Sequence, residues 1–191
     1  KSFELKRKNL NKFKYFLLYG NNQGLIEEII QNNLKPNLSK NIFNYDEGEI
    51  INNTEKFKEE LLNKSFFEKE KLIIISRVSD KIFKIMEEIV TINIEDISLI
   101  LKTGSLEKKS KIRNLFEKSS NTICIPFYED SNQSLSMIFQ DFLKKKNINI
   151  SQHDINLIID RAKGDRINLK NELSKLSNLL ITRNNISIKD V

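Results

Sequence analysis

Residues Tyr15–Ile26 read YFLLYGNNQGLI, the pattern of a buried strand, a glycine turn and the start of a helix. A phosphate-binding loop has this architecture, but it also needs a Lys that reaches the phosphates and a Ser or Thr that binds Mg²⁺. Here three residues separate Gly20 from Gly24, and the apolar residues Leu25 and Ile26 follow. We therefore expect a nucleotide-binding type of fold whose loop, a structural turn at Gly20 and Gly24, does not bind ATP.

Apolar runs alternate with helix-period segments through the first two-thirds of the chain. The predicted strands are Tyr15–Tyr19, Ile42–Tyr45, Leu72–Ile75, Ile97–Leu101 and Thr122–Ile125. The predicted helices between them are Leu25–Leu34, Asn53–Leu62, Ser79–Ile89 and Lys108–Lys118. Continuous apolar runs are typical of strands covered on both faces, and strand–helix alternation indicates a parallel sheet. We expect an α/β domain over residues 1–128, with a parallel five-stranded sheet flanked by helices.

The pattern changes after Pro126 and becomes helical. Leu135, Ile138, Phe139 and Phe142 form an apolar helical stripe, and a second seam contains Leu169, Leu173, Leu176 and Leu180. These periods predict a small three-helix domain over residues 129–185. Residues 186–191 have the pattern of the start of a further domain.

Composition narrows the class of protein. The net charge is +6, with basic clusters at Lys6–Lys8, Lys108–Arg113 and Lys144–Lys146. These clusters fit either solvated helix faces or weak contacts with a phosphate backbone. No apolar run approaches the roughly 20 residues of a membrane span, and no secretory signal opens the sequence. Cys124 and His153 each stand alone, so we expect a cytoplasmic protein without a disulfide or a zinc site.

Two adjacent aromatic residues, Phe66 and Phe67, lie in the strongly charged segment Asn63–Lys71. Neighbours on a regular helix point about 100° apart, so both cannot face the same core from one helix. Packing in the core and projection into a partner's pocket both remain open for this pair. Buried aromatic residues are typical anchors of protein interfaces.

Several motifs, in order and spacing over nearly the whole chain, resemble the delta subunit of the bacterial DNA polymerase III clamp loader. The motifs are Tyr15–Gly20 with Gln23–Glu28, Ser65–Phe67 before Leu72–Ile75, Leu101–Lys111, and Gly164–Asp165 with Asn171–Leu176. The resemblance implies an AAA+-like fold with a degenerate nucleotide site. It also implies a protein that binds the ring-shaped sliding clamp and springs one of its interfaces open.

In that family an apolar pair on a helix of the first domain wedges into the clamp's hydrophobic pocket. By motif position the pair is Phe66 and Phe67 here, with Leu62 and Ser65 beside it. The family pattern is commonly Leu-Phe, so this chain departs from it at the first anchor.

Two further positions differ from ATP-binding relatives. The strand Leu72–Ile75 ends in Ser76 and Arg77, where an acidic residue would organise Mg²⁺. Such relatives often carry Gly-Asp-x-Arg in the helical domain, whereas Arg166 stands one position earlier in this chain. With the altered turn at Gly20, these departures predict no ATP hydrolysis, no catalytic activity, no metal and no cofactor.

The resemblance also implies partners. They are the sliding clamp (beta subunit) and the other loader subunits, gamma/tau and delta prime, which are joined mainly through a C-terminal collar that this sequence only begins. DNA contact would be indirect or weak, and no membrane contact is expected. The larger assembly is a DNA-directed DNA polymerase, a nucleotidyltransferase.

Two other functions remain as alternatives. One is a P-loop-type NTPase of replication initiation or repair, which would bind nucleotide. The other is a basic DNA-binding module, which would bind DNA with a strong salt dependence. Titrations with nucleotide and with DNA distinguish all three.

Overall fold

The computed structural model describes residues 13–38, 41–62 and 70–182. Within them the chain forms two compact units. The first contains residues 13–21 and Ile26–Phe127, and the second contains Asn22–Leu25 together with the described residues from Tyr128 onward. The sequence prediction placed residues 22–25 inside the first domain, whereas the structure groups them with the helical unit.

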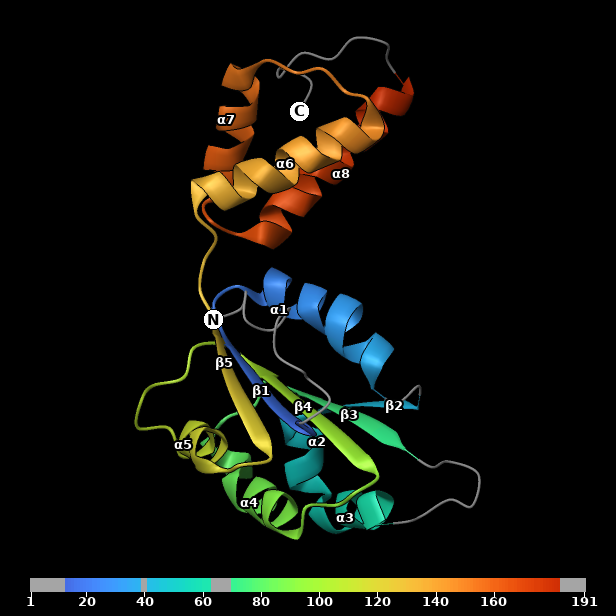
Figure 1. Ribbon diagram of the computed structural model, residues 1–191, viewed down its shortest axis with the longest axis vertical. Helices are drawn as coiled ribbons and strands as arrows, with labels where there is room; N and C mark the ends of the chain where they lie inside the picture. The colour runs from blue at the N-terminus through green and yellow to red at the C-terminus, as the bar shows by residue number, and fades with distance from the viewer. Residues whose placement is uncertain (1–12, 39–40, 63–69, 183–191) are drawn as a thin grey trace. The chain divides into compact units, whose positions relative to one another are not determined.

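A five-stranded parallel sheet forms the centre of the first unit (Figure 1). The strands are β1 (Tyr15–Gly20), β2 (Ile42–Asp46), β3 (Lys71–Ser76), β4 (Ile97–Thr103) and β5 (Thr122–Phe127). Their spatial order is β2-β3-β4-β1-β5, and every neighbouring pair is parallel. The predicted α/β class and all five predicted strands are confirmed, each strand being slightly longer than the apolar run that indicated it.

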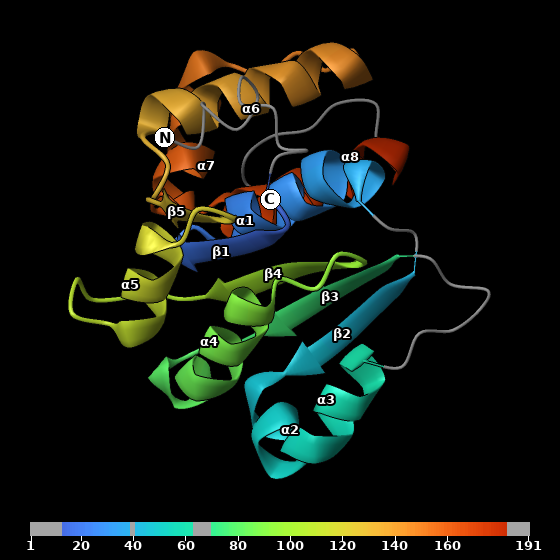
Figure 2. The same ribbon diagram turned by 60° about the horizontal axis from the view of Figure 1, so that its bottom comes forward.

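Helices cover both faces of the sheet (Figure 2). The helix α1 (Gln23–Ile29) lies on one face, and α2 (Glu47–Asn52), α3 (Thr54–Leu62), α4 (Phe83–Ile92) and α5 (Lys111–Lys118) lie on the other. Burial on both sides explains why the interior strand β1 has no exposed residue, and why its sequence is a continuous apolar run.

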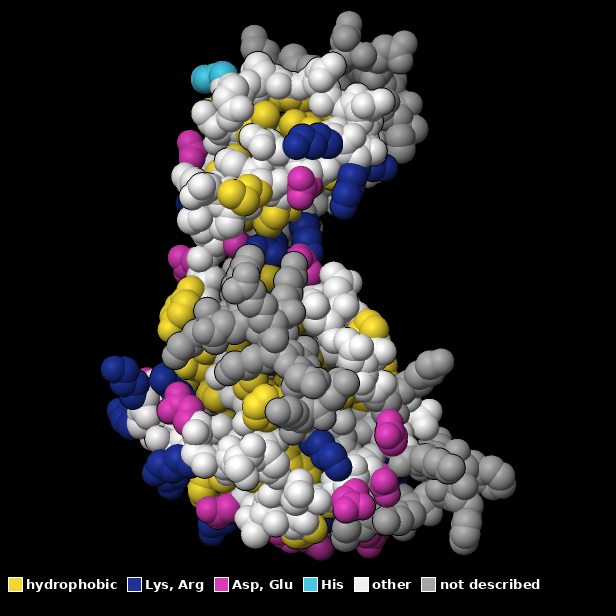
Figure 3. Space-filling view, in the orientation of Figure 1, with side chains coloured by type: hydrophobic (Ala, Val, Ile, Leu, Met, Phe, Trp, Pro, Cys, Tyr) yellow, Lys and Arg dark blue, Asp and Glu magenta, His cyan; other side chains and the backbone are white. Residues whose placement is uncertain are grey.

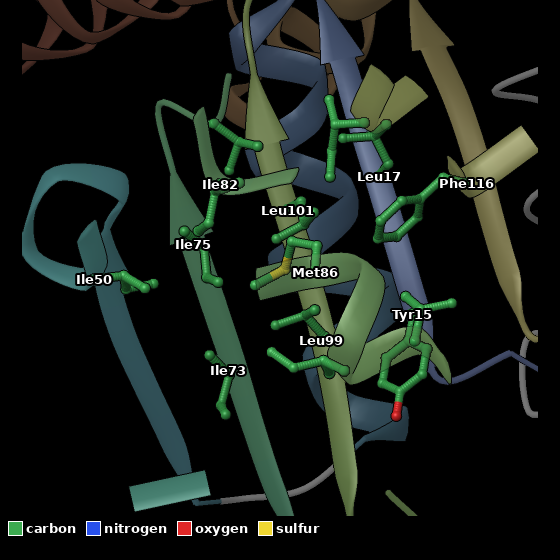
Figure 4. Packing of buried hydrophobic residues seen from close by; sticks show 14 of the residues in the cluster. Tyr15, Leu17, Ile50, Ile73, Ile75, Ile82, Met86, Leu99, Leu101 and Phe116 are labelled. Carbon is green, nitrogen blue, oxygen red and sulfur yellow. The ribbon is translucent and has the colours of Figure 1, made fainter. Parts of the chain in front are cut away.

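The main core lies between the sheet and helices α2 to α5. Tyr15 and Leu17 of β1 pack in one cluster with Met86 of α4 and Phe116 of α5 (Figure 4). The buried Tyr15 hydroxyl donates to the carbonyl oxygen of Ile94 at 3.4 Å, which satisfies the polar end of this core side chain.

The helices differ from the sequence prediction at their ends. The apolar segment predicted as one helix to Leu34 is α-helical to Ile29, then forms a π-helix over Ile30–Leu34 and a 3₁₀ turn over Lys35–Asn37. The helix α2 was not predicted. It begins at a capping box. The Asp46 side chain accepts a hydrogen bond from the Gly48 N–H, and the Glu49 side chain accepts one from the Asp46 N–H.

Two predicted helices start later than expected. A 3₁₀ turn at Asp80–Ile82 precedes α4. The helix α5 starts at Lys111 rather than Lys108, because Ser110 caps it and Asp80 Oδ1 accepts from the Ile112 N–H at 3.0 Å.

The second unit contains three described helices, α6 (Asn132–Lys146), α7 (Gln152–Ala162) and α8 (Arg166–Thr182). Their apolar faces form one core, whose buried members include Leu135, Phe139, Ile158, Ile159, Leu169, Leu173 and Leu176. Ser131 and Ser151 cap α6 and α7. Across the described ranges, no helix has both the length and the apolar character needed to cross a membrane.

The turn that ends β1 depends on Gly20. Its φ is +135°, a conformation that L side chains rarely adopt, and a Cβ at this position would lie 2.0 Å from the Phe127 carbonyl oxygen of β5. The Gly20 N–H donates to the Gly104 carbonyl oxygen at 3.0 Å. Close backbone packing is therefore enough to explain the glycine at this position, and no phosphate contact is needed to account for it.

We expect Gly20→Ala to destabilise the first unit by about 2 kcal/mol or more, because the methyl group would overlap a backbone oxygen in a strained conformation. Urea unfolding followed by circular dichroism measures the loss. The matched control is Gly104→Ala, where a Cβ would meet nothing within 4 Å. Equal stability of the two variants would contradict the assignment of Gly20.

Candidate functional site

The first turn of α1 is fastened by Asn22, which is 4% exposed. Its Oδ1 accepts from the Leu25 N–H at 3.0 Å, as a helix-capping residue does. Its Nδ2 donates to the Tyr128 carbonyl oxygen at 3.0 Å and to Asp130 Oδ2 at 2.9 Å. One amide side chain thus uses both of its polar atoms within the second unit.

The second glycine of the turn, Gly24, packs against the start of α8. A Cβ at Gly24 would lie 2.9 Å from Ile167 Cγ1 and 3.2 Å from Arg166 Cβ. The glycine is needed because α8 approaches the backbone closely. Both glycines of the loop are thus explained by packing, which favours the structural turn predicted from the sequence.

Arg166 and Asp130 form a buried ion pair. The guanidinium donates from Nε to Asp130 Oδ2 at 2.8 Å and from Nη2 to Asp130 Oδ1 at 2.7 Å. The two side chains are 10% and 6% exposed. Burial raises the pKa of the Asp130 carboxyl, but the hydrogen bonds from Arg166 and Asn22 and the Arg166 charge outweigh burial and hold that pKa below its ordinary value. We call Asn22, Asp130 and Arg166 the Asp130 cluster.

A positively charged side chain, that of Arg77, follows the end of β3. Arg77 has a φ of 57°, and its Nε lies 2.6 Å from Asp46 Oδ2. The rest of its side chain is largely exposed. In the part of the chain that the structure describes, no three His, Cys, Asp or Glu residues gather closely enough to hold a metal ion.

The predicted clamp-binding residues lie at the border of the described chain. Leu62 is the last residue of α3, whereas Ser65, Phe66 and Phe67 fall in residues 63–69, outside the described residues. Their assignment stays a prediction.

The described flanks of this segment are joined. Lys71, at the start of β3, donates from Nζ to the Glu60 carbonyl oxygen of α3 at 2.8 Å, and Nζ lies 5.9 Å from the ring centroid of Phe43. Tyr45 donates its hydroxyl to Glu60 Oε2 at 2.7 Å. The last turn of α3 and the first residue of β3 are therefore held together.

The described basic clusters are largely solvated. Lys108 and Lys109 in the loop before α5 and Lys111 at its first position are exposed, and basic side chains gather at one corner of the first unit (Figure 3). Arg113 lies over the Tyr19 ring and pairs with Glu117 at 2.8 Å. The three lysines of Lys144–Lys146 stand in the last turn of α6, where positive charge favours the helix dipole. The cluster Lys6–Lys8 lies outside the described residues.

The lone thiol and imidazole offer no chemistry. Cys124 is half-buried in β5, and burial raises the pKa of its thiol to about 12. A thiol with so high a pKa is a poor nucleophile. His153 is exposed at the start of α7.

Sequence reasoning missed Asn22 and Asp130. Each is a single polar residue in a turn, and they are 108 positions apart. The available signals were a cap residue before α1 and an acid three residues after the apolar strand β5. Neither signal identifies its partner.

Comparisons with solved structures define the class of fold. The chain is similar to the DNA clamp loader delta protein of Bacillus subtilis, with 14% identity, a TM-score of 0.60, and coverage of 100% of this chain and 61% of that one. It is similar to domain III of the replication initiation protein DnaA of Thermotoga maritima, with 13% identity, a TM-score of 0.56, and coverage of 99% and 85%. It is also similar to the RuvB Holliday junction branch migration motor of Thermotoga maritima, with 11% identity, a TM-score of 0.60, and coverage of 99% and 64%.

The chain thus has an α/β fold of the AAA+ type, as the sequence predicted. No protein-family model matches the sequence, and no curated protein matches it. The chain spans less than two thirds of the length of the delta protein and of RuvB.

We expect Asp130→Asn to destabilise the second unit by about 3 kcal/mol at pH 7, because it leaves the Arg166 charge buried without a counter-ion. A carboxyl whose folded pKa is lowered stabilises above the unfolded pKa, about 4 for Asp, and the effect is lost as pH falls through the folded pKa. The stability difference from wild type is therefore expected to be constant above about pH 6 and to shrink below about pH 4.

Urea unfolding at a series of pH values measures this difference. The matched control is Asp141→Asn, at an exposed position of α6, which is expected to follow wild type throughout. A penalty for Asp130→Asn that does not change with pH would contradict a role for the ionised carboxylate.

Proposed function

We propose that this chain belongs to a delta-type clamp-loader subunit that binds the sliding clamp and opens its ring without hydrolysing ATP. The single observation that carries the proposal is the combination of an AAA+-like fold with an arginine already engaged by the chain's own carboxylate. Arg166 is the one buried arginine among the described residues of the helical unit, and its guanidinium is paired with Asp130.

Two observations support the absence of ATPase activity. Leu25 and Ile26 stand where a phosphate loop needs Lys and Ser or Thr, and Ile26 is fully buried. Arg77 rather than an acidic residue follows β3. On this proposal the chain is a non-catalytic component of a DNA polymerase assembly.

Two observations support clamp binding. The fold is similar to that of a DNA clamp loader delta protein along the whole chain. The Phe66–Phe67 segment runs between the fixed end of α3 and the fixed start of β3, which Lys71 and Glu60 join. Fixed flanks lower the entropy lost when a short segment binds.

Ring opening follows from differential binding. A wedge that contacts a relaxed or opened clamp better than a closed ring shifts the ring toward opening, by no more than that difference in affinity. The partners are the clamp and, through a collar, gamma/tau and delta prime in the cytoplasm. DNA contact by the exposed lysines is indirect or weak.

We expect the chain to bind the sliding clamp of the same organism with micromolar or tighter affinity in surface plasmon resonance. Removing both rings with Phe66→Ala/Phe67→Ala is expected to weaken binding at least about a hundredfold, since each buried Phe contributes roughly 1.5–3 kcal/mol.

A matched control removes two exposed apolar side chains elsewhere, Ile92 and Met137, which are 57% and 56% exposed. The variant Ile92→Ala/Met137→Ala is expected to bind like wild type. A folded wild-type chain that does not bind the clamp would refute the proposed function.

We expect no binding of Mg-ATP by the isolated chain in calorimetric titration at micromolar to millimolar nucleotide. The apolar residues after Gly24 provide neither the phosphate-binding ammonium nor the Mg²⁺-binding hydroxyl. A saturable heat with a micromolar dissociation constant would favour the alternative of a P-loop-type NTPase.

A further inference from the structure

The Asp130 cluster has the donor arrangement of an anion-binding site. Arg166 presents two parallel N–H groups to one carboxylate, the fork geometry that recognises carboxylates and phosphates. Asn22 adds a third donor on the same carboxylate, at 2.9 Å from Oδ2. Three N–H groups from two distant parts of the sequence thus converge on one oxyanion.

The converging groups are buried. Asn22 is 4% exposed and Arg166 is 8% exposed as whole residues. Charged and amide groups are rarely so buried unless their hydrogen bonds are satisfied, because desolvation without a partner is costly. An anion at this position is therefore a requirement of the fold, and Asp130 provides it.

The surrounding backbone leaves little free space. A Cβ on Gly24 would meet the start of α8 at 2.9 Å, and a Cβ on Gly164 would lie 3.3 Å from the Asp130 carbonyl oxygen. Two glycines thus let the backbone pack closely at the start of α8 and beside Asp130.

We propose that Asn22 and Arg166 form an oxyanion-binding site that is permanently occupied by the chain's own carboxylate, that of Asp130. The site takes a planar monocarboxylate and is already filled in the wild-type protein. Asp130→Ala removes the carboxylate, a group that formate matches in shape and charge. The three donors are then expected to face the place that the carboxylate occupied. This self-occupied site requires no clamp and no nucleotide.

Chemical rescue tests this assignment. Thermal unfolding of the full chain is followed by circular dichroism in sodium formate and in sodium chloride of equal ionic strength. Asp130→Ala is expected to melt well below wild type in chloride. At formate concentrations about tenfold above its dissociation constant, the melting temperature is expected to rise by about 5 °C or more.

Two control variants make the rescue specific. Asp130→Asn keeps the space filled, so formate is expected to act on it no more than chloride does. Asp130→Ala/Arg166→Met lacks the guanidinium, and is expected to lose the formate effect. If Asp130→Ala is unfolded in chloride, recovery of the helical signal in formate is the same test.

An Asp130→Ala variant that responds equally to formate and chloride, whether folded or unfolded at the start, would overturn the proposal. A formate effect of equal size in Asp130→Ala/Arg166→Met would overturn it as well, because the gain would then not require the guanidinium.

Discussion

The carboxylate of Asp130 is the interaction on which the turn after β1 and the start of α8 both depend. It neutralises Arg166 at the first residue of α8 and accepts from Asn22, which caps α1. Burial makes this ion pair costly to form but far more costly to break on one side only. The helical unit thus contains a buried ion pair whose hydrogen bonds are all made by the chain's own residues.

The sequence departs from the ATP-binding pattern at three places. They are the glycine turn at Gly20, the strand end at Arg77 and the position of Arg166. Each is satisfied here by other means: close backbone packing at Gly20 and Gly24, an ion pair of Arg77 with Asp46, and the Asp130 carboxylate. We propose that such a scaffold serves binding rather than hydrolysis.

The sheet was predictable because strands covered on both faces leave a strong local signal, such as the uninterrupted apolar run of β1. The short helix α2 was missed because six residues carry too little periodicity, although its Asp46–Glu49 capping box was present in the sequence. The start of α5 was misjudged because it depends on Asp80, 32 residues from Ile112. The Asp130 cluster could not be predicted, since its three members come from separate parts of the sequence and only tertiary structure brings them together.

The central claim is ring opening without nucleotide, and a sliding clamp with a self-quenching fluorophore pair across one subunit interface tests it most directly. Adding this chain alone is expected to raise the fluorescence to a plateau that Mg-ATP does not change, because the wedge acts by differential affinity and the Asp130 cluster needs no ligand. An interface signal that stays quenched at saturating chain, or that rises only when ATP is present, would contradict the account.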